Sequence, residues 1–199
     1  MRLVLASRSP QRRAILRGLG VRFTVRQPGF DETEQGDPPQ VALANALGKA
    51  RSVARRDDEV VLGVDTIVAL DGRIYGKPAH EAQARATLEA LSGATHTVFS
   101  GVALVGPSVE PRTAVAATAV TFHALDQATI DSYLATGEWQ GRAGGYAIQG
   151  AGAALVLALD GDHTNVVGLP VATLLALWPA LPRGCNIAVS APDPIRLQH

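Results

Sequence analysis

Hydrophobic positions along the chain follow two patterns, one typical of buried strands and one typical of helices that bury a single face. Short apolar runs bounded by polar or glycine-containing turns predict strands over 3–6, 21–26, 60–70, 95–105 and 113–122. Helical spacing predicts a helix after Ser9-Pro10 and further helices over 38–56, 82–91, 126–135 and 170–178. We expect one hairpin between 95–105 and 113–122 and a second between 153–159 and 163–167.

The order of these segments predicts an α/β fold with a mixed sheet, part parallel and part antiparallel, and flanking helices. A length of 199 residues suits one domain with a substantial core. We expect that domain to span 1–180. Residues 181–199 are expected to form a proline-containing tail, with loose attachment from Pro179 onward.

Composition and charge exclude several classes of protein. Hydrophobic residues make up 47% of the chain and charged residues 18%, which excludes a disordered chain. Eighteen basic and eighteen acidic residues cancel, so we expect no nucleic-acid partner and no anionic membrane partner. Membrane spans and signal peptides need longer apolar runs than this sequence has. Cys185 is the single cysteine, so an internal disulfide is excluded and the cytoplasm is the expected compartment.

Residues 7–13 read Ser-Arg-Ser-Pro-Gln-Arg-Arg and follow the first predicted strand. Ser9 is expected to cap a helix that Pro10 opens, which places Arg12 and Arg13 in its first turn. Cations are unfavourable there by about 0.3–1 kcal/mol each, because the helix N-terminus already carries partial positive charge. The pattern favours a bound anion held by backbone N–H groups, hydroxyls and both guanidinium groups. The alternative is that both arginines extend into water.

Asp65 interrupts the most hydrophobic predicted strand, which is apolar on both of its alternating faces. A carboxylate buried there costs several kcal/mol unless it is paired, hydrogen-bonded or bound to a metal. Such groups are concentrated at functional sites, which makes Asp65 the first candidate for catalysis. A structural salt bridge to an arginine is the alternative.

Further candidates are an acidic loop, the two lysines and a glycine-rich segment. Residues 31–34 read Asp-Glu-Thr-Glu and could supply a second carboxylate to Mg²⁺ or Mn²⁺, although such a loop is often merely solvated. Lys49 and Lys77 are the only lysines beside sixteen arginines, and they fit phosphate contacts or surface positions equally well. Five glycines lie within 141–152, where the amide of Gln149 could bind the edge of a base or cap the loop. His96 lies in a predicted strand with no second ligand at metal spacing, so we expect a core or edge histidine.

The sequence resembles the Maf family of nucleoside triphosphate pyrophosphatases over about residues 3 to 178. Eight motifs carry the resemblance in order and spacing: Ser-Arg-Ser-Pro-Gln-Arg-Arg at 7–13, Asp-Glu at 31–32, Lys-Ala at 49–50, Gly-Val-Asp-Thr-Ile-Val at 63–68, Gly-Lys-Pro at 76–78, Leu-Ser-Gly-Ala-Thr-His at 91–96, Gly-Gly-Tyr-Ala-Ile-Gln-Gly at 144–150 and Val-Gly-Leu-Pro at 167–170. The resemblance implies an elongated sheet similar to that of inosine triphosphate pyrophosphatases, with two lobes around a cleft and often a homodimer.

The resemblance also implies hydrolysis of a nucleoside triphosphate to the monophosphate and pyrophosphate with Mg²⁺ or Mn²⁺. Asp65 would be the proton acceptor and, with Glu32, a metal ligand. Phosphate contacts in the catalytic site would come from Lys49 and Lys77. The positions implied for substrate binding are Ser7, Gln11, Arg12, Arg13, Thr66 and Gln149.

Thr66 and Gln149 match the branch of the family that prefers dTTP and UTP. Gln11 departs from that branch, which usually has arginine directly after the Ser-Pro pair. A pyrophosphatase for 7-methyl-GTP or CTP on the same scaffold therefore stays an alternative, as does a nucleotide-sensing module that does not hydrolyse. A regular pleat would send Asp65 and Thr66 to opposite faces of their strand, so we expect Gln149 to contribute more to base choice than Thr66.

Overall fold

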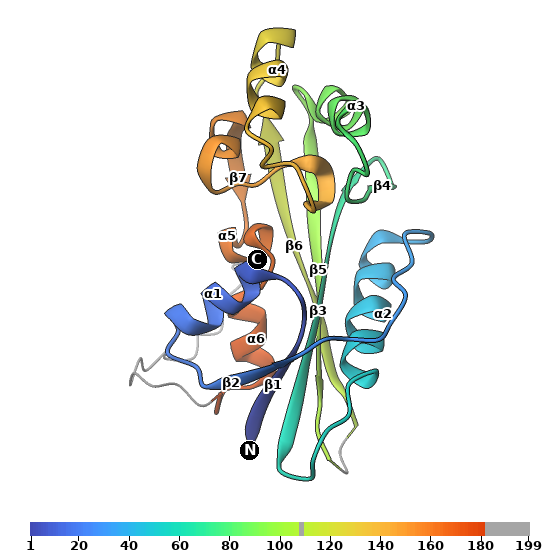
Figure 1. Cartoon of the computed structure of the whole chain (residues 1–199), viewed down its shortest axis with the longest axis vertical. Helices are drawn as coiled ribbons and strands as arrows, with labels where there is room; N and C mark the ends of the chain where they lie inside the picture. Colours follow the sequence, from blue (N-terminus) through green and yellow to red (C-terminus); the bar gives the residue numbers. More distant parts are fainter. Residues whose placement is uncertain (108–109, 182–199) are drawn as a thin grey trace, which may run out of the picture.

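Strands and helices alternate along most of the chain in the computed structural model, which describes residues 1–107 and 110–181 (Figure 1). In chain order the elements are β1 (Arg2–Ala6), α1 (Pro10–Gly18), β2 (Phe23–Arg26), α2 (Pro38–Arg51), β3 (Glu59–Leu70), β4 (Arg73–Tyr75), α3 (Glu81–Leu91), β5 (Thr95–Val105), β6 (Arg112–Phe122), α4 (Gln127–Ala135), the short 3-10 helices η1 (Ala143–Gly145) and η2 (Gly150–Leu155), β7 (Val156–Asp160), α5 (His163–Val167) and α6 (Val171–Leu177). No helix in this described part is both long enough and apolar enough to cross a membrane.

The strands form one mixed sheet in the order β2-β1-β3-β5-β6-β7, with β4 paired to the far end of β3. β2, β1 and β3 run parallel, whereas β3, β5, β6 and β7 pair antiparallel with their neighbours. The predicted mixed sheet with flanking helices is confirmed, as is the predicted hairpin between 95–105 and 113–122.

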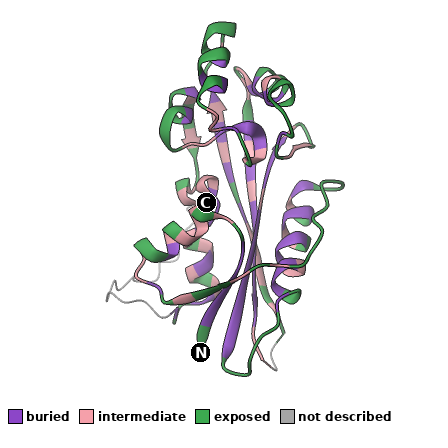
Figure 2. Cartoon of the chain, in the orientation of Figure 1, coloured by how far each residue is buried: buried purple, intermediate pink, exposed green. Residues whose placement is uncertain are grey.

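The sheet divides its side chains between its two faces, as the period of two along each strand requires. On one face, residues of β1, β3 and β5 contact α1 and α6 in a core that includes Leu5, Leu62 and Leu174. On the other face, the intervening residues contact α2. Toward the upper end in Figure 1, a separate core joins β5, β6, α3 and α4. Figure 2 shows the central strands β1, β3 and β5 mostly buried between these layers.

Three sequence predictions need correction. Residues 163–167 form the short helix α5 rather than the second strand of a hairpin, because Asp162 caps it by accepting a bond from the Thr164 N–H at 2.7 Å. β7 instead pairs with β6. Helix α2 ends at Arg51, five residues before the predicted end. The loose attachment expected from Pro179 onward does not hold for Leu181, which is buried in the same core as Trp178. Residues 182–199, including Cys185, lie outside the described part.

The edge of β3 is open over a short stretch in its middle. Pairing with β1 ends where Ala6 meets Gly63, and pairing with β4 begins only at Val68. Within the described residues, 64–67 therefore pair with β5 on one side and with no strand on the other. This open stretch lies between the two ends of the molecule that carry the separate cores. Side chains from both faces of β3, including those of Asp65 and Thr66, can therefore border the space beside it.

Candidate active site

A cavity with a volume of about 610 Å³ lies against this open edge of β3. Its lining comes from both ends of the molecule: the β1–α1 turn, the acidic loop, β3, the segment after β4, the glycine-rich loop and the end of α5. Five cationic side chains, Arg8, Arg12, Lys49, Lys77 and Arg142, face it together with the carboxylates of Asp31, Glu32 and Asp65. Five cations against three carboxylates leave an excess of positive charge, which suits a polyanionic ligand.

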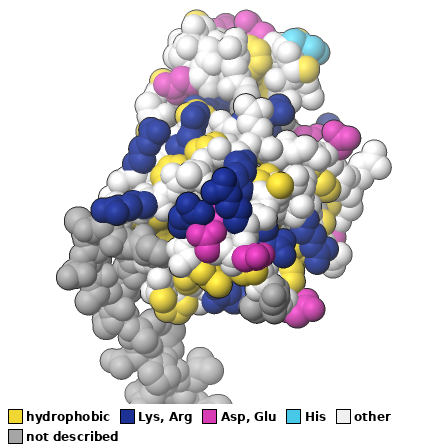
Figure 3. All heavy atoms as spheres, turned by 60° about the horizontal axis from the view of Figure 1, so that its bottom comes forward, with side chains coloured by type: hydrophobic (Ala, Val, Ile, Leu, Met, Phe, Trp, Pro, Cys, Tyr) yellow, Lys and Arg dark blue, Asp and Glu magenta, His cyan; other side chains and the backbone are white. Residues whose placement is uncertain are grey.

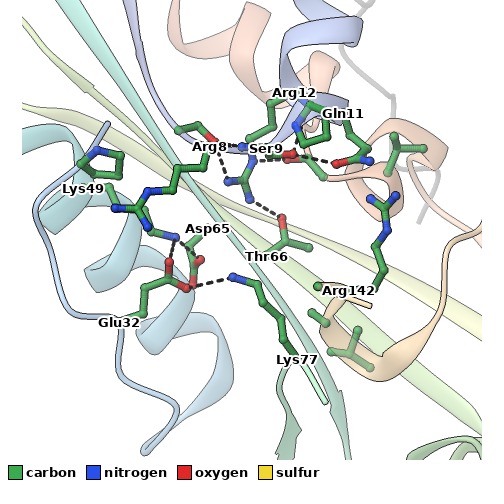
Figure 4. A pocket seen from close by; sticks show the side chains of 18 of the residues that line it. Arg8, Ser9, Gln11, Arg12, Glu32, Lys49, Asp65, Thr66, Lys77 and Arg142 are labelled. Carbon is green, nitrogen blue, oxygen red and sulfur yellow. Dashed lines mark hydrogen bonds and ion pairs between the residues drawn. The ribbon is translucent and has the colours of Figure 1, made fainter. Parts of the chain in front are cut away.

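Asp65 and Glu32 share one buried ammonium group. Lys49 Nζ lies 2.6 Å from Asp65 Oδ1 and 2.8 Å from Glu32 Oε1, and the exposed Lys77 extends toward the other oxygen of Glu32 at 3.6 Å (Figure 4). Burial alone would raise the pKa of Glu32, but the hydrogen bond and charge of Lys49, with Lys77 and Arg12, outweigh it and lower that pKa. The partner of Asp65 is thus a lysine inside the cavity rather than the structural arginine considered above.

Asn45 is a member of this cluster that the sequence reasoning missed. It lies four residues before Lys49 on α2, so both side chains emerge from the same helix face. Its Nδ2 donates to Asp65 Oδ2 at 2.9 Å. The usable signal was an asparagine inside an alanine-rich helix at this spacing from a lysine.

Arg12 is held in the cavity by three neutral acceptors. Its Nε donates to the Gly168 carbonyl at 2.8 Å, Nη1 to Ser7 Oγ at 3.2 Å and Nη2 to Thr66 Oγ1 at 3.1 Å. Burial lowers the pKa of this guanidinium, while Asp65 and Glu32 act in the opposite direction. The predicted cap is present, since Ser9 Oγ accepts from the Arg12 N–H at 3.4 Å.

Arg13 does not line the cavity, contrary to the expected pair of guanidinium groups. Consecutive residues on a helix point in different directions, so Arg12 and Arg13 cannot both face one ligand. The second arginine from this turn is Arg8, and Arg142 adds another from the glycine-rich loop; the sequence reasoning assigned a role to neither. Within the described residues, the half-buried side chain of Arg142 makes no hydrogen bond or ion pair.

Asp65 and Thr66 both line the cavity although they leave opposite faces of β3, because the open edge lets the cavity extend around the strand. Figure 4 shows Thr66 beside Arg12, away from Glu32 and Asp65. The Thr66 hydroxyl is already bonded to Arg12 and, at 2.9 Å, to Ser100 Oγ. Gln149 lies outside the main cavity; it lines an adjoining cavity of about 130 Å³ together with Gln11 and Arg142. Gln11 lines both cavities.

Three side chains fix the glycine-rich loop at the edge of the cavity. The Tyr146 hydroxyl hydrogen-bonds to His96 Nε2 at 2.8 Å inside the upper core, and the Tyr133 hydroxyl accepts from the Ala147 N–H at 3.0 Å. Glu138 accepts from the N–H groups of Ala151 and Gly152. His96 is thus a core histidine, in line with the sequence interpretation.

The donor set fits a hard divalent cation. The two carboxylates contact the same ammonium group, so they lie close enough together to share one ion. Among the described residues, no histidine, cysteine or further carboxylate joins these two carboxylates as a third ligand. Mg²⁺ commonly uses one or two carboxylates and fills its other positions with water and substrate phosphates.

Comparisons with known proteins show the family to which the chain belongs. Residues 2–180 match the family model described as Maf-like protein. The chain belongs to the Maf family. Among its Maf relatives, the dTTP/UTP pyrophosphatase of Moorella thermoacetica is 48% identical over 184 residues, which cover 89% of this chain and 95% of that protein. The dTTP/UTP pyrophosphatase of Deinococcus radiodurans is 44% identical over 178 residues, covering 88% and 91%.

Solved structures align with this Maf chain less extensively. The Staphylococcus aureus Ham1 protein aligns with a TM-score of 0.45 at 18% identity, covering 61% of this chain and 72% of that one.

Proposed function

We propose that the chain is a nucleoside triphosphate pyrophosphatase that releases a nucleoside monophosphate and pyrophosphate. The observation that carries the proposal is the carboxylate of Asp65, buried in β3 yet facing a cavity that five cations line. A carboxylate in such a position can act as a general base, and the cations can bind a triphosphate. Membership of the family supports the same reaction.

The cations would bind and orient the triphosphate. Arg12 is already held by neutral oxygens, so it offers its charge without reorganising. Lys77 and Arg142 come from the opposite side of the cavity, where they can contact other phosphate oxygens (Figure 4). Phosphoryl transfer depends mainly on such positioning and on neutralising the charge of the equatorial oxygens.

Asp65 would orient a water molecule and accept its proton. Each carboxylate oxygen receives one donor, Lys49 at Oδ1 and Asn45 at Oδ2, which fixes the carboxylate and leaves lone pairs toward the cavity. As the water oxygen bonds to the α-phosphorus, the bond from that phosphorus to the bridging oxygen breaks and pyrophosphate leaves. A divalent cation held by Glu32 and Asp65 would supply charge stabilisation on the phosphates.

The proposed substrates are dTTP and UTP, since those nucleotides appear in the names of the relatives. The adjoining cavity between Gln11 and Gln149 is the candidate base site, because the Thr66 hydroxyl is already bonded to Arg12 and Ser100. Gln11 keeps 7-methyl-GTP and CTP as alternative substrates. The proposed role is removal of non-standard nucleotides in the cytoplasm, with a link to arrest of cell division. The proposed oligomer is a homodimer, for which light scattering would measure a mass of twice 20.7 kDa.

Gln149→Glu tests this base site. Uracil and thymine present two carbonyl acceptors, which a charged acceptor repels, so kcat/KM for UTP and dTTP should fall relative to CTP and 7-methyl-GTP. Gln149 is exposed without ligand, and a mismatched polar pair that the bound base covers supports a change of about a hundredfold in the specificity ratio. The measurement is kcat/KM for these four nucleotides in both proteins. An unchanged ranking would place base recognition elsewhere, with Gln11 the next position to vary.

Pyrophosphate release from a panel of common and modified nucleoside triphosphates tests the proposed reaction. Asp65→Asn keeps the volume and removes the base, so turnover should fall by about 10³-fold or more while nucleotide affinity stays within about tenfold. Arg13→Ala is the control and should retain turnover, because Arg13 lies outside the cavity. Binding without any release by the wild type would indicate a nucleotide sensor. Normal turnover in Asp65→Asn would remove Asp65 from the role of base.

A further inference from the structure

The acidic loop and Asp65 are connected through a single side chain. Asn45 is 1% exposed and lies on α2, the helix that packs against one face of β3. Its Oδ1 accepts from the Thr33 N–H at 3.1 Å, and its Nδ2 donates to the Thr33 carbonyl and to Asp65 Oδ2, both at 2.9 Å. The amide therefore uses both donor hydrogens and its acceptor, and it binds both backbone groups of the residue that follows Glu32.

Glu32 depends on this connection for its position. The acidic loop lies between β2 and α2 without strand or helix structure of its own. Glu32 is bound to Lys49 through an ion pair, which orients the carboxylate but leaves the backbone of the loop free to move. The paired bonds from Asn45 fix the neighbouring peptide groups instead, because a side-chain amide that bonds both backbone groups of one residue restricts its position and its rotation.

We propose that Asn45 is the positioning residue that fixes Glu32 relative to Asp65, so that the two carboxylates act as one unit. The inference rests on the proposed function, in which both carboxylates serve the hydrolysis. Asn45 touches neither substrate nor the reacting water in this scheme. Its effect passes through the Thr33 backbone to Glu32 and directly to the orientation of Asp65.

The first test measures the loop itself. Hydrogen exchange of a peptide covering 30–36 should be about tenfold faster in Asn45→Ala than in the wild type, because the Thr33 N–H loses its acceptor. Asn165→Ala is the matched control: Asn165 is equally buried and donates twice, to the Val98 carbonyl and Thr118 Oγ1, at a distance in sequence from the loop. It should leave exchange in 30–36 unchanged. Unchanged exchange in Asn45→Ala would overturn the proposal whatever the enzyme does.

The second test is a double-mutant cycle on turnover. Loss of a residue that orients site carboxylates typically costs about 10–100-fold, which we expect in kcat for Asn45→Ala, with a smaller change in KM. In a Glu32→Ala background the same substitution should cost at most about threefold, since the effect through Glu32 is gone and only the bond to Asp65 remains to be lost. Additive losses would show a merely structural role and overturn the proposal. Asn165→Ala should be additive with Glu32→Ala.

Asn45→Asp guards against loss of fold in the alanine variant. It is isosteric and can still accept from the Thr33 N–H, but it donates to neither the Thr33 carbonyl nor Asp65. Its kcat should fall at least as far as in Asn45→Ala, and wild-type turnover would overturn the proposal. If the wild type releases no pyrophosphate, the proposed function fails, whereas the exchange experiment still decides the role of Asn45.

Discussion

At the scale of single residues, Arg12 shows how hydrogen bonds can outweigh the field of a helix. The helix dipole alone predicts that removing this cation from the first turn stabilises α1 by about 0.3–1 kcal/mol. The three bonds to Gly168, Ser7 and Thr66 act in the opposite direction, since each bond from a charged donor contributes about 1.5–3 kcal/mol. Burial and the helix dipole both oppose the charge of Arg12, so these three bonds are what hold the guanidinium in place without a ligand.

Arg12→Ala should lower the free energy of unfolding by about 1–3 kcal/mol and lower kcat/KM by about one to three orders of magnitude. Urea denaturation without nucleotide measures the first quantity, and pyrophosphate release measures the second. A gain in stability would show that the helix dipole dominates, and unchanged kinetics would remove Arg12 from the anion site.

His96 gives the fold a dependence on pH that is separate from the active site. Burial lowers the pKa of this histidine from 6.5 to about 4. Below pH 6.5 the unfolded chain takes up a proton that the folded chain refuses, so stability falls as the pH drops from 6.5 toward 4 and then levels off. The total loss is about 3 kcal/mol.

His96→Gln retains a hydrogen-bonding group near Tyr146 and does not titrate, so its stability should change less over the same range of pH. Urea denaturation of both proteins at pH 7, 5.5 and 4 measures the difference. Parallel losses in the two proteins would assign the acid sensitivity to other groups.

The sequence identified Asp65 because a carboxylate in an apolar strand violates a local rule, and that violation is visible without a structure. Asn45 violates no such rule. Its partners Thr33 and Asp65 are 12 and 20 residues away, so only the tertiary fold reveals the contacts. Arg13 was expected beside Arg12 because both fall in the first helical turn, but it does not line the cavity, since the sequence position alone does not show in which direction a helical side chain points.

At the scale of elements, two glycines allow α2 to approach the sheet closely. Gly101 on β5 is the register partner of Asp65, and a Cβ there would lie 2.2 Å from the Ala42 carbonyl oxygen. A Cβ on Gly63 would lie 2.1 Å from the carbonyl oxygen of Ala46. The absence of these side chains brings Asn45 and Lys49 within hydrogen-bonding distance of Asp65.

Gly101→Ala should therefore displace α2, lower the free energy of unfolding by about 1–3 kcal/mol and reduce kcat by at least about tenfold. Gly106→Ala is the matched control, since its Cβ would meet only Val60 at 3.8 Å, an ordinary contact. Thermal denaturation and turnover of both variants check the expectation. Wild-type turnover in Gly101→Ala would show that the helix can retreat without disturbing the site.

The strand predicted over 163–167 was wrong because tertiary contacts, which the sequence does not show, favour the helix α5. Residues 163–167 contain threonine and two valines, which favour strands, and they follow a Gly-Asp pair that suits a turn. The outcome is decided by the Asp162 cap and by Asn165, whose buried amide binds the Val98 carbonyl. Tertiary contacts of this kind override propensity in a segment of five residues, whereas the long strands β3, β5 and β6 were predicted from pattern alone.

At the scale of the whole molecule, the cavity joins two separately packed regions. Arg12 and Lys49 come from elements that pack on one end of the sheet, and Arg142 comes from the loop that packs on the upper core. A triphosphate bound to all three would connect both regions. Figure 3 shows Lys and Arg side chains near the middle of the face turned forward, with carboxylates beside them. Because the eighteen basic and eighteen acidic residues of the chain cancel, binding relies on the cavity and not on a general field.

Arg142→Ala isolates this connection. The unliganded protein should keep its stability within about 0.5 kcal/mol, because the Arg142 side chain has no hydrogen bond or ion pair in the described part of the chain. Affinity for a non-hydrolysable triphosphate should fall by about tenfold or more. Calorimetric titration and thermal denaturation, with and without the analogue, separate the two quantities. A large loss of stability without ligand would make Arg142 a structural residue.

The open stretch of β3 has a consequence for how the site tolerates change over evolution. Peptide groups at 64–67 that face away from β5 have no strand partner in the part of the chain that the structure describes, so they stay available to a ligand in the cleft. Substitutions other than those to proline leave the N–H and C=O groups of the backbone in place. Side chains around the cleft could therefore diverge, and substrate choice with them, while any contact between a ligand and these backbone groups would be kept.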